Sequence, residues 1–129
     1  MKLYTSYFDN IPNIPEDIHK ISITGKDNSD LFNWDRYPKL APKRWFWKQW
    51  YEKVQQRDPK ANDFYIQNYE EQVLSVLNAN EVLEDIKVIS NCKDAVLLCF
   101  ETPDKFCHRH IVSKWFNDNS IDCEEYRWE

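Results

Sequence analysis

The segment that most constrains the fold is AVLLCF at 95–100, because every residue in it is apolar. A run of this kind is typical of a central strand that is covered on both faces in a parallel sheet. Apolar and polar residues alternate in KLYTSYF at 2–8 and in DIHKISIT at 17–24, which predicts two further strands. The segment IDCEEYRW at 121–128 predicts a last strand. These four segments supply the sheet of the expected fold.

Helical spacing of apolar residues fills much of the chain between these strands. The expected helices are 43–56, 63–79, 81–90 and 107–118, with Asn62 or Asp63 as the cap of the second. Turn-forming residues without a sustained period predict an extended structured loop at 25–42. Strands that alternate with helices favour an α/β fold in which helices flank a small, mostly parallel sheet. A chain of 129 residues is expected to form one domain, 1–129.

Composition excludes several functional classes. The chain has one glycine, so a phosphate-binding loop built on several glycines is excluded, and we predict no cofactor. No apolar run approaches the roughly 20 residues that span a bilayer, and the start of the chain lacks a signal segment. We therefore expect a cytoplasmic protein without membrane contact. Four cysteines without CxxC spacing are expected to be reduced thiols, and a net charge of -5 argues against general nucleic-acid affinity.

Reactive side chains are concentrated directly after the apolar run. They are Cys99, Glu101, Cys107, His108 and Arg109. Ligands of open α/β sheets bind beyond the carboxyl ends of the strands, and Cys107 would lie at the start of the next helix, where the helix dipole stabilises an anion. Cys107 is then a candidate nucleophile, with a histidine or Glu101 as its acid or base. Alternatively, Arg109 and the helix start bind a phosphate or carboxylate, or Cys107 only caps a packed helix while Arg109 pairs with Glu101.

Two further side chains and a metal were considered for the same edge of the sheet. Ser6 and Tyr7 end the first predicted strand there, so they are candidate ligand contacts, with ordinary turn capping and core burial as the alternative. A zinc site would have to use Cys107 with His108 or His110, Cys99 and Cys123. Adjacent cysteine and histidine residues rarely reach one ion, and no CxxC pair supports a closed tetrahedral site, so we predict no metal.

A basic and aromatic helix is expected around KRWFWKQWYEK. The region between 36 and 60 contains eight basic residues and two acidic ones. Alternating rings and cations resemble a nucleic-acid platform. A helical wheel weakens that interpretation, since it assigns most of the rings to a core face: Phe46, Trp47, Trp50, Tyr51 and Val54. Trp45 projects instead among polar residues, so Trp45, Arg44 and Lys48 are candidate contacts for a ligand or partner.

Several segments together resemble a known family. They are LYTSYF near the start, ISITG, YPKLAP at 37–42, FYIQNYEEQVL at 64–74 and, as the most specific block, LLCFETPDKFCHRHIVSKWF at 97–116. The chain resembles the DUF488 family of prokaryotic and phage proteins, a family of unknown function. The resemblance implies a Rossmann-like α/β fold. It also implies recurrent positions at Ser6, Tyr7, Cys99, Glu101, Cys107, His108 and Arg109.

Two functional hypotheses follow from these observations. The first is binding of an anionic ligand, a nucleotide or nucleic-acid related molecule, at the carboxyl edge of the sheet, with cysteine-dependent chemistry at Cys107. Glu101 and His108 would act as acid or base and Arg109 as the anion clamp. The second is a non-catalytic binding or inhibitor module, encoded by a phage, that engages a host protein partner through the aromatic basic helix and loop 25–42. Whether His19, His108 or His110 reaches Cys107 stays open at this stage.

Overall fold

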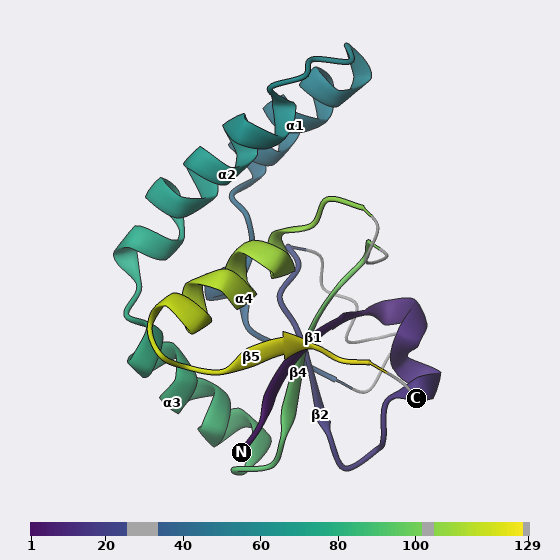
Figure 1. Ribbon diagram of the computed structural model, residues 1–129, viewed down its shortest axis with the longest axis vertical. Coiled ribbons are helices and arrows are strands. Elements are labelled where there is room, and N and C mark those ends of the chain that lie inside the picture. Colours follow the sequence, from purple (N-terminus) through teal and green to yellow (C-terminus); the bar gives the residue numbers. More distant parts are fainter. Residues whose placement is uncertain (26–33, 102–104, 128–129) are drawn as a thin grey trace.

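Five parallel strands form one sheet in the computed structural model, which describes residues 1–25, 34–101 and 105–127 (Figure 1). The strands lie in the order β3-β2-β4-β1-β5. Their bounds are β1 (Leu3–Tyr7), β2 (His19–Ser22), β3 (Asp35–Arg36), β4 (Ala95–Cys99) and β5 (Cys123–Glu125). Every pairing in the sheet is parallel, so the predicted α/β class is confirmed. Part of the expected last strand, Trp128, lies outside the described residues.

Helices follow the strands as the apolar spacing predicts. The four α-helices are α1 (Arg44–Gln55), α2 (Ala61–Gln72), α3 (Ala79–Ser90) and α4 (His108–Asp118) among the residues described. Short 3-10 turns are η1 (Phe8–Asn13), η2 (Pro38–Leu40) and η3 (Leu74–Val76). Helices α1 and α2 form a hairpin that extends beyond the sheet, whereas α3 and α4 lie along it (Figure 1). In the part of the chain that the structure describes, no helix is long and apolar enough to cross a membrane.

Strand β4 is buried on both faces, which explains its continuous apolar sequence. Ala95 and Leu97 pack in the core cluster that includes residues of all four α-helices. Val96 and Leu98 alternate with them and pack in a second cluster under η1. The neighbouring strand β1 alternates in the same way, since Leu3 packs in the first cluster and Tyr4 against the second.

The expected loop at 25–42 is only partly described, since 26–33 lie outside the described residues. Within the rest, two residues form the edge strand β3, where Ile21 of β2 is in register with Asp35. The turn η2 follows and buries Leu40. The expected extended structured loop thus contains a strand at 35–36 and a 3-10 turn at 38–40 that were not predicted, because elements of two or three residues are too short to show a period.

The helix predicted at 63–79 is interrupted in the structure. Helix α2 ends at Gln72, η3 follows, and Val76, which lies within the range of the predicted helix, has an exposed fraction of 75 %. The side chain of Asn78 caps α3 by accepting hydrogen bonds from the backbone N–H groups of Asn80 and Glu81. A polar cap of this kind favours a new helix start over continuation of the previous helix.

The cap expected for α2 is also wrong. Lys60 occupies the N-cap position and makes no side-chain capping bond. Asn62 lies inside the helix instead, where its Oδ1 accepts a hydrogen bond of 3.0 Å from Nε1 of Trp50. This bond joins α1 to α2 across the hairpin.

The core face assigned to α1 is the largest correction to the expected fold. Phe46 is fully buried and Trp50 half-buried, as predicted. The other three residues that the helical wheel assigned to the core face are exposed. The exposed fractions are 43 % for Trp47, 49 % for Tyr51 and 40 % for Val54. The wheel failed because α1 packs on α2 through a narrow stripe and the hairpin reaches past the sheet, where nothing covers its outer side in the described structure.

Candidate functional site

The carboxyl ends of β1 and β4 meet at the point where the chain changes direction in the sheet. Tyr7 ends β1 and is in register with Cys99, the last residue of β4. The connection after β1 leads past β4 to β2, and the connection after β4 leads past β1 to β5. Neighbouring strands whose connections leave in opposite directions create the usual ligand position of α/β sheets. The sequence placed its candidate residues at this edge.

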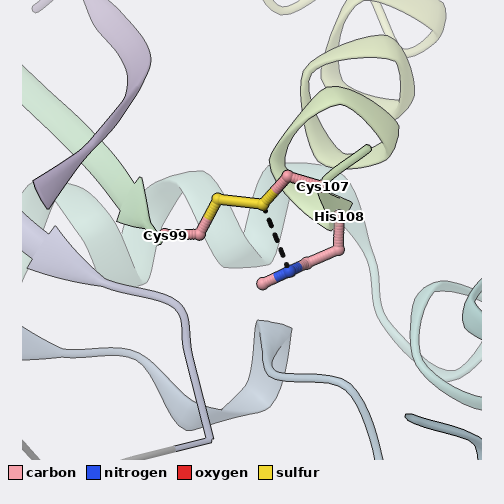
Figure 2. Close-up of side chains that lie close together, drawn as sticks. All are labelled: Cys99, Cys107 and His108. Atoms are coloured by element: carbon pink, nitrogen blue, oxygen red, sulfur yellow. Dashed lines mark hydrogen bonds between the residues drawn. A yellow bond between two sulfur atoms is a disulfide. The ribbon is translucent and has the colours of Figure 1, made fainter. Parts of the chain in front are cut away.

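Cys99 and Cys107 are joined by a disulfide that links the end of β4 to the N-cap of α4 (Figure 2). The expectation that all four cysteines are reduced thiols is therefore wrong for this pair. The fold brings the strand end and the helix start together across a sequence separation of eight, which is not one of the close CxxC spacings that indicate a paired site in a sequence. Cys92 and Cys123 remain free, and burial raises the pKa of the Cys123 thiol to about 12.

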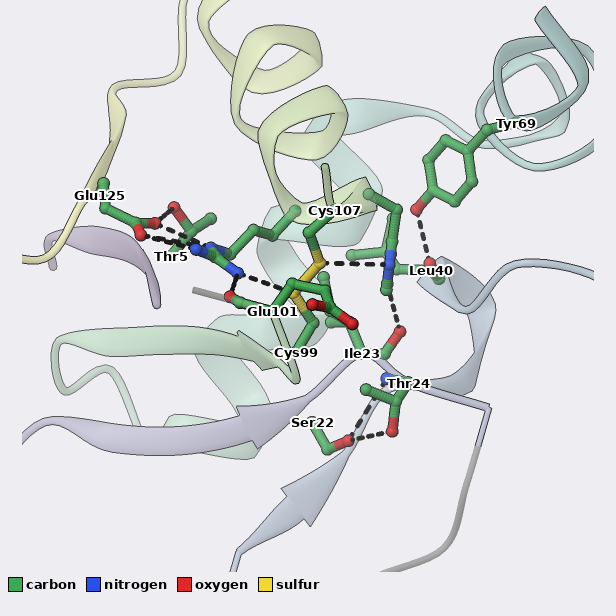
Figure 3. The surroundings of a disulfide bond; sticks show 12 residues. Thr5, Ser22, Ile23, Thr24, Leu40, Tyr69, Cys99, Glu101, Cys107 and Glu125 are labelled. Atoms are coloured by element: carbon green, nitrogen blue, oxygen red, sulfur yellow. Dashed lines mark hydrogen bonds and ion pairs between the residues drawn. A yellow bond between two sulfur atoms is a disulfide. The ribbon is translucent and has the colours of Figure 1, made fainter. Parts of the chain in front are cut away.

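His108 is the histidine that reaches Cys107. Its Nδ1 lies 3.8 Å from Sγ of Cys107, and its Nε2 lies 2.8 Å from the backbone oxygen of Ile23, to which it donates (Figure 3). That bond fixes the tautomer, because a carbonyl can only accept, so Nδ1 presents its lone pair to the sulfur. Burial lowers the pKa of His108 to about 4, and Arg109 and His110 act in the same direction. The ring is neutral at neutral pH.

Arg109 is fully buried and forms the central contact of the site. Its Nε and Nη2 donate to the carboxylate of Glu125 at 3.0 Å, and its Nη1 donates to Sγ of Cys99 at 3.1 Å (Figure 3). Nη1 also donates to the backbone oxygen of Glu101. The guanidinium further lies 5.6 Å from the ring centre of Tyr7. Arg109 thus ties α4, β4 and β5 together and places a positive charge beside a sulfur.

Arg109 is not placed as the sequence hypotheses expected. Its ion pair is with Glu125 and not with the side chain of Glu101, so the expected strand-to-helix pair is wrong in its partner. Both bonds to Glu125 and the bond to Cys99 occupy the guanidinium inside the protein. Direct contact of Arg109 with an external anion stays a prediction. In the structure, Arg109 binds groups of the protein itself.

The structure does not bring Glu101, Ser6 and Tyr7 together at this edge of the sheet. The side chain of Glu101 is exposed. Tyr7 lies on the same face of the sheet as Cys99, whereas Ser6 is buried on the opposite face, where its Oγ accepts a hydrogen bond of 3.0 Å from Asn10. Tyr7 is therefore beside the disulfide, and Ser6 is not.

The remaining candidates lie away from the disulfide. His19 is at the start of β2, the opposite end of the strand, and its Nε2 is 2.6 Å from Asp35. His110 is exposed on α4, and its pKa is lowered by partial burial and by Arg109. The three predicted contacts on α1 are exposed on the helical hairpin and do not join the sulfur cluster: Arg44, Trp45 and Lys48.

Three side chains lie close enough together to hold a metal ion, although their spacing in the sequence did not indicate such a group. The ligating atoms of Cys99, Cys107 and His108 all lie within 4.8 Å of one another, so an adjacent cysteine and histidine can face the same point here. Two features favour sulfur chemistry over a cation. The guanidinium of Arg109 contacts Cys99, which opposes a second positive charge, and the two sulfurs are bonded to each other.

Comparison with known proteins identifies the family. A family model described as DUF488-N3a, the active DUF488-N3 subclade, matches residues 12–120. The chain belongs to the DUF488 family. The match covers all four α-helices of the described residues and the complete cysteine block, so the resemblance inferred from the sequence is confirmed. No curated protein and no solved structure matches the chain.

Sequence reasoning missed three members of the DUF488 site. Glu125 of β5 binds Arg109, Thr5 of β1 donates to Glu125 at 2.8 Å, and the backbone oxygen of Ile23 orients His108. The sequence did contain a signal for Glu125, because a buried arginine needs an anionic partner and β5 carries two acidic residues. The role of the Ile23 oxygen had none, since any residue supplies a backbone carbonyl.

A surface pocket of the DUF488 chain lies away from the cysteines. It has a volume of about 390 Å³ and is lined by residues of α2, η3 and α4. Its wall includes the exposed pair Lys114 and Asp118, whose charged atoms are 2.7 Å apart. None of the candidate residues from the sequence lines this pocket, so it does not belong to the sheet-edge site.

Proposed function

We propose that the protein binds an anionic ligand of the nucleotide class at the carboxyl edge of its sheet and carries out cysteine-dependent chemistry there through Cys107. The observation that carries this proposal is the fixed ring of His108, whose lone pair faces Sγ of Cys107 at 3.8 Å while Ile23 holds the other nitrogen. A nucleophile, a base within reach and a group that orients the base form the usual arrangement of covalent catalysis.

The chemistry requires the reduced form of the site. Two thiols of a cellular reductant donate two electrons and two protons to the Cys99–Cys107 disulfide, which yields two cysteine thiols and one disulfide in the reductant. The thiol proton of Cys107 is then within reach of Nδ1 of His108, which accepts a hydrogen bond in this tautomer. Cys107 also lies at the N-cap of α4, where the helix dipole stabilises a thiolate.

The second sulfur of the pair has its own stabilising group. Nη1 of Arg109 donates to Sγ of Cys99, so a negative charge on Cys99 would be held by a buried cation. Cys99 can thus serve as a resolving thiol that closes the disulfide again after a reaction at Cys107. Glu101 lies two residues after Cys99, is exposed, and is available as an acid or base for a bound ligand.

Rings at the same edge support a ligand that carries a base. Phe100 follows β4 with an exposed fraction of 49 %, and its ring centre is 4.8 Å from that of Phe8, which follows β1. Phe8 in turn stacks on Trp34 at 4.8 Å. Exposed ring faces bind bases by stacking without regard to base identity. The start of α4 and exposed Lys105 provide positive potential for a phosphate close by.

Calorimetric titration of nucleoside mono-, di- and triphosphates into reduced protein tests this proposal. We expect binding to the reduced wild type and a chemical product by mass spectrometry, whereas Cys107→Ser should bind the same nucleotide without forming product. Cys92→Ser is the matched control, since Cys92 is free and exposed, and it should behave as wild type. Equal product from Cys107→Ser, or no nucleotide binding in either redox state, would overturn the proposal.

A second candidate is a binding function without catalysis, and the exposed rings of α1 favour it. Trp45, Trp47 and Tyr51 are each exposed by more than 40 %, which exceeds what helix packing needs. This candidate predicts that Cys107→Ser has no effect on biological activity. The part of loop 25–42 at 26–33, which the sequence analysis included in this surface, lies outside the described residues.

A further inference from the structure

We propose that the outer face of α1 binds single-stranded nucleic acid. The α1 outer face is defined by Arg44, Trp47, Lys48, Tyr51 and Val54. The inference follows from the exposure of side chains that the sequence assigned to the core, and it does not depend on chemistry at Cys107. It adds a second contact region to the protein, on a different element from the sheet-edge site.

These five residues form one continuous stripe along the helix. Their spacings of three and four residues place them on the same side of α1, opposite buried Phe46. The stripe combines two cations with two rings, all of which are exposed. Glu52, the acidic residue of this helix, lies beyond Lys48 at the edge of the stripe and not within it.

The two rings stack on each other, and we call this exposed pair the stacking platform. Trp47 and Tyr51 have ring centres 5.6 Å apart and an angle of 14° between their planes. Trp47 also contacts half-buried Trp50, whose ring is held by its hydrogen bond to Asn62, so the platform has a fixed support. A base can stack on an exposed ring of this kind, and stacking of one base on an aromatic side chain is a main source of affinity for single strands.

The two cations are free to contact phosphates. Within the part of the chain that the structure describes, neither Arg44 nor Lys48 forms an ion pair, whereas Lys114 does. They are one helical turn apart and flank the platform. The chain as a whole has a net charge of -5, but eight basic and two acidic residues lie between 36 and 60, so this region is locally basic and would attract a polyanion toward α1.

Other occupants of the face fit less well. A second copy of this chain on the same face would add two more cations to an interface whose five defining residues include no acidic side chain, and like charges at an interface cost binding energy. A purely apolar peptide would leave both cations without partners. A duplex hides its bases, so it would use the cations but not the rings. A strand with accessible bases and regular phosphates matches both.

Fluorescence anisotropy of a labelled oligothymidylate, titrated with the full chain, tests the inference. We expect saturable binding. The logarithm of the association constant should fall linearly with the logarithm of the salt concentration, with a slope of about -1.4, which corresponds to two phosphate contacts on a single strand. The double variant Arg44→Gln and Lys48→Gln should remove most of that slope. Lys114→Gln removes one exposed positive charge on α4, away from the α1 outer face, and should leave the binding unchanged.

The contribution of stacking is tested separately from charge. Trp47→Ala together with Tyr51→Ala should weaken binding by roughly ten-fold or more at constant salt. Trp47→Phe together with Tyr51→Phe retains both rings and should restore most of the affinity. Circular dichroism checks that α1 stays folded in each variant. Cys107→Ser should bind as wild type, which separates this inference from the proposed chemistry.

Four results would overturn the inference. The first is no binding of oligothymidylate at low salt. The second is equal binding of a ring-free polyanion such as polyphosphate, with no effect of the alanine variants, since this would mean attraction by charge alone. The third is preferential binding of an acidic peptide over the oligonucleotide. The fourth is self-association in sedimentation that disappears in the alanine variants, which would assign the face to a second copy.

Discussion

Two arginines show how differently the two regions of this molecule use the same side chain. Arg109 at the sheet edge has no exposed surface and donates to Glu125, Cys99 and Glu101. Arg44 on α1 is exposed and forms no ion pair within the described residues. A buried guanidinium with satisfied donors organises the protein around it, whereas an exposed one is available to a partner. The comparison teaches that burial, and not residue type, separates the internal framework from the contact surface.

The largest expected difference between the two regions is the loss of stability when each arginine is replaced in turn. Arg109→Met leaves the carboxylate of Glu125 without its partner, so the free energy of unfolding should fall by about 3 to 5 kcal/mol. Arg44→Met should change it by less than about 0.5 kcal/mol. Urea denaturation followed by circular dichroism measures both. An Arg109→Met protein as stable as wild type would show that the buried network does not hold α4 to the sheet.

The two sides of α1 provide a second comparison within one helix. Phe46→Ala removes a fully buried ring that packs on Tyr65 and Tyr69, so it should cost about 3 to 5 kcal/mol of unfolding free energy. Trp47→Ala removes a ring of the α1 outer face and should cost far less, about 0.5 kcal/mol. Thermal and urea unfolding of the two variants are the measurements. Similar losses for both would mean that the outer face is covered.

Acidification tests whether His108 belongs to the internal framework. Its folded pKa of about 4 lies below the ordinary value of 6.5, so the unfolded chain binds the proton more readily between these values. The stabilising contribution is complete above pH 6.5 and is lost as the pH falls toward 4, by about 3 kcal/mol. Urea unfolding at pH 7 and pH 4 should therefore show a smaller loss in His108→Gln than in wild type.

His110 serves as the control for this pH effect. It is adjacent in sequence but exposed, and its pKa is lowered by partial burial and by Arg109. His110→Gln should retain most of the wild-type dependence on pH. If the His108 and His110 variants lose the dependence equally, the acid sensitivity does not come from the ring that faces Cys107.

Trp50 joins the two regions, and its variant has the smallest expected effect among those that change a contact inside the protein. Its ring contacts Phe106, next to Cys107, at 5.7 Å, and its Nε1 donates to Asn62. Trp50→Phe keeps a ring and removes the hydrogen bond, so the free energy of unfolding should fall by about 1 kcal/mol. The same variant should leave the reactivity of Cys107 unchanged. A large change in reactivity would show that the hairpin and the sheet-edge site are coupled.

The sheet and the place of the site were predictable because their signals are local. The apolar run at 95–100 indicates a strand covered on both sides, and the reactive residues that follow it lie at its carboxyl end in the structure. The start of α4 at His108, with Cys107 as N-cap, also agrees with the predicted helix at 107–118. Each of these features depends on residues close together in the chain.

The parts that failed depend on distant contacts. The disulfide partner of Cys107 and the carboxylate that binds Arg109 come from other elements, so spacing alone does not identify them. The face of α1 failed for a related reason. Apolar periodicity shows that Trp47 and Tyr51 lie on one side of a helix, but it does not show whether another element covers that side. An unexpected exposed ring is therefore more informative about function than an expected buried one.

The most direct test of the central claim is site-resolved alkylation of the folded protein at neutral pH, with and without a thiol reductant, followed by mass spectrometry. The claim is that Cys99 and Cys107 form a reversible pair whose Cys107 is activated on reduction. Without reductant, exposed Cys92 should react while Cys99 and Cys107 do not. After reduction, Cys107 should react much faster than buried Cys123, and Cys99→Ser should make Cys107 reactive without reductant. Alkylation of wild-type Cys107 without reductant, or a rate as slow as that of Cys123 after reduction, would contradict the account.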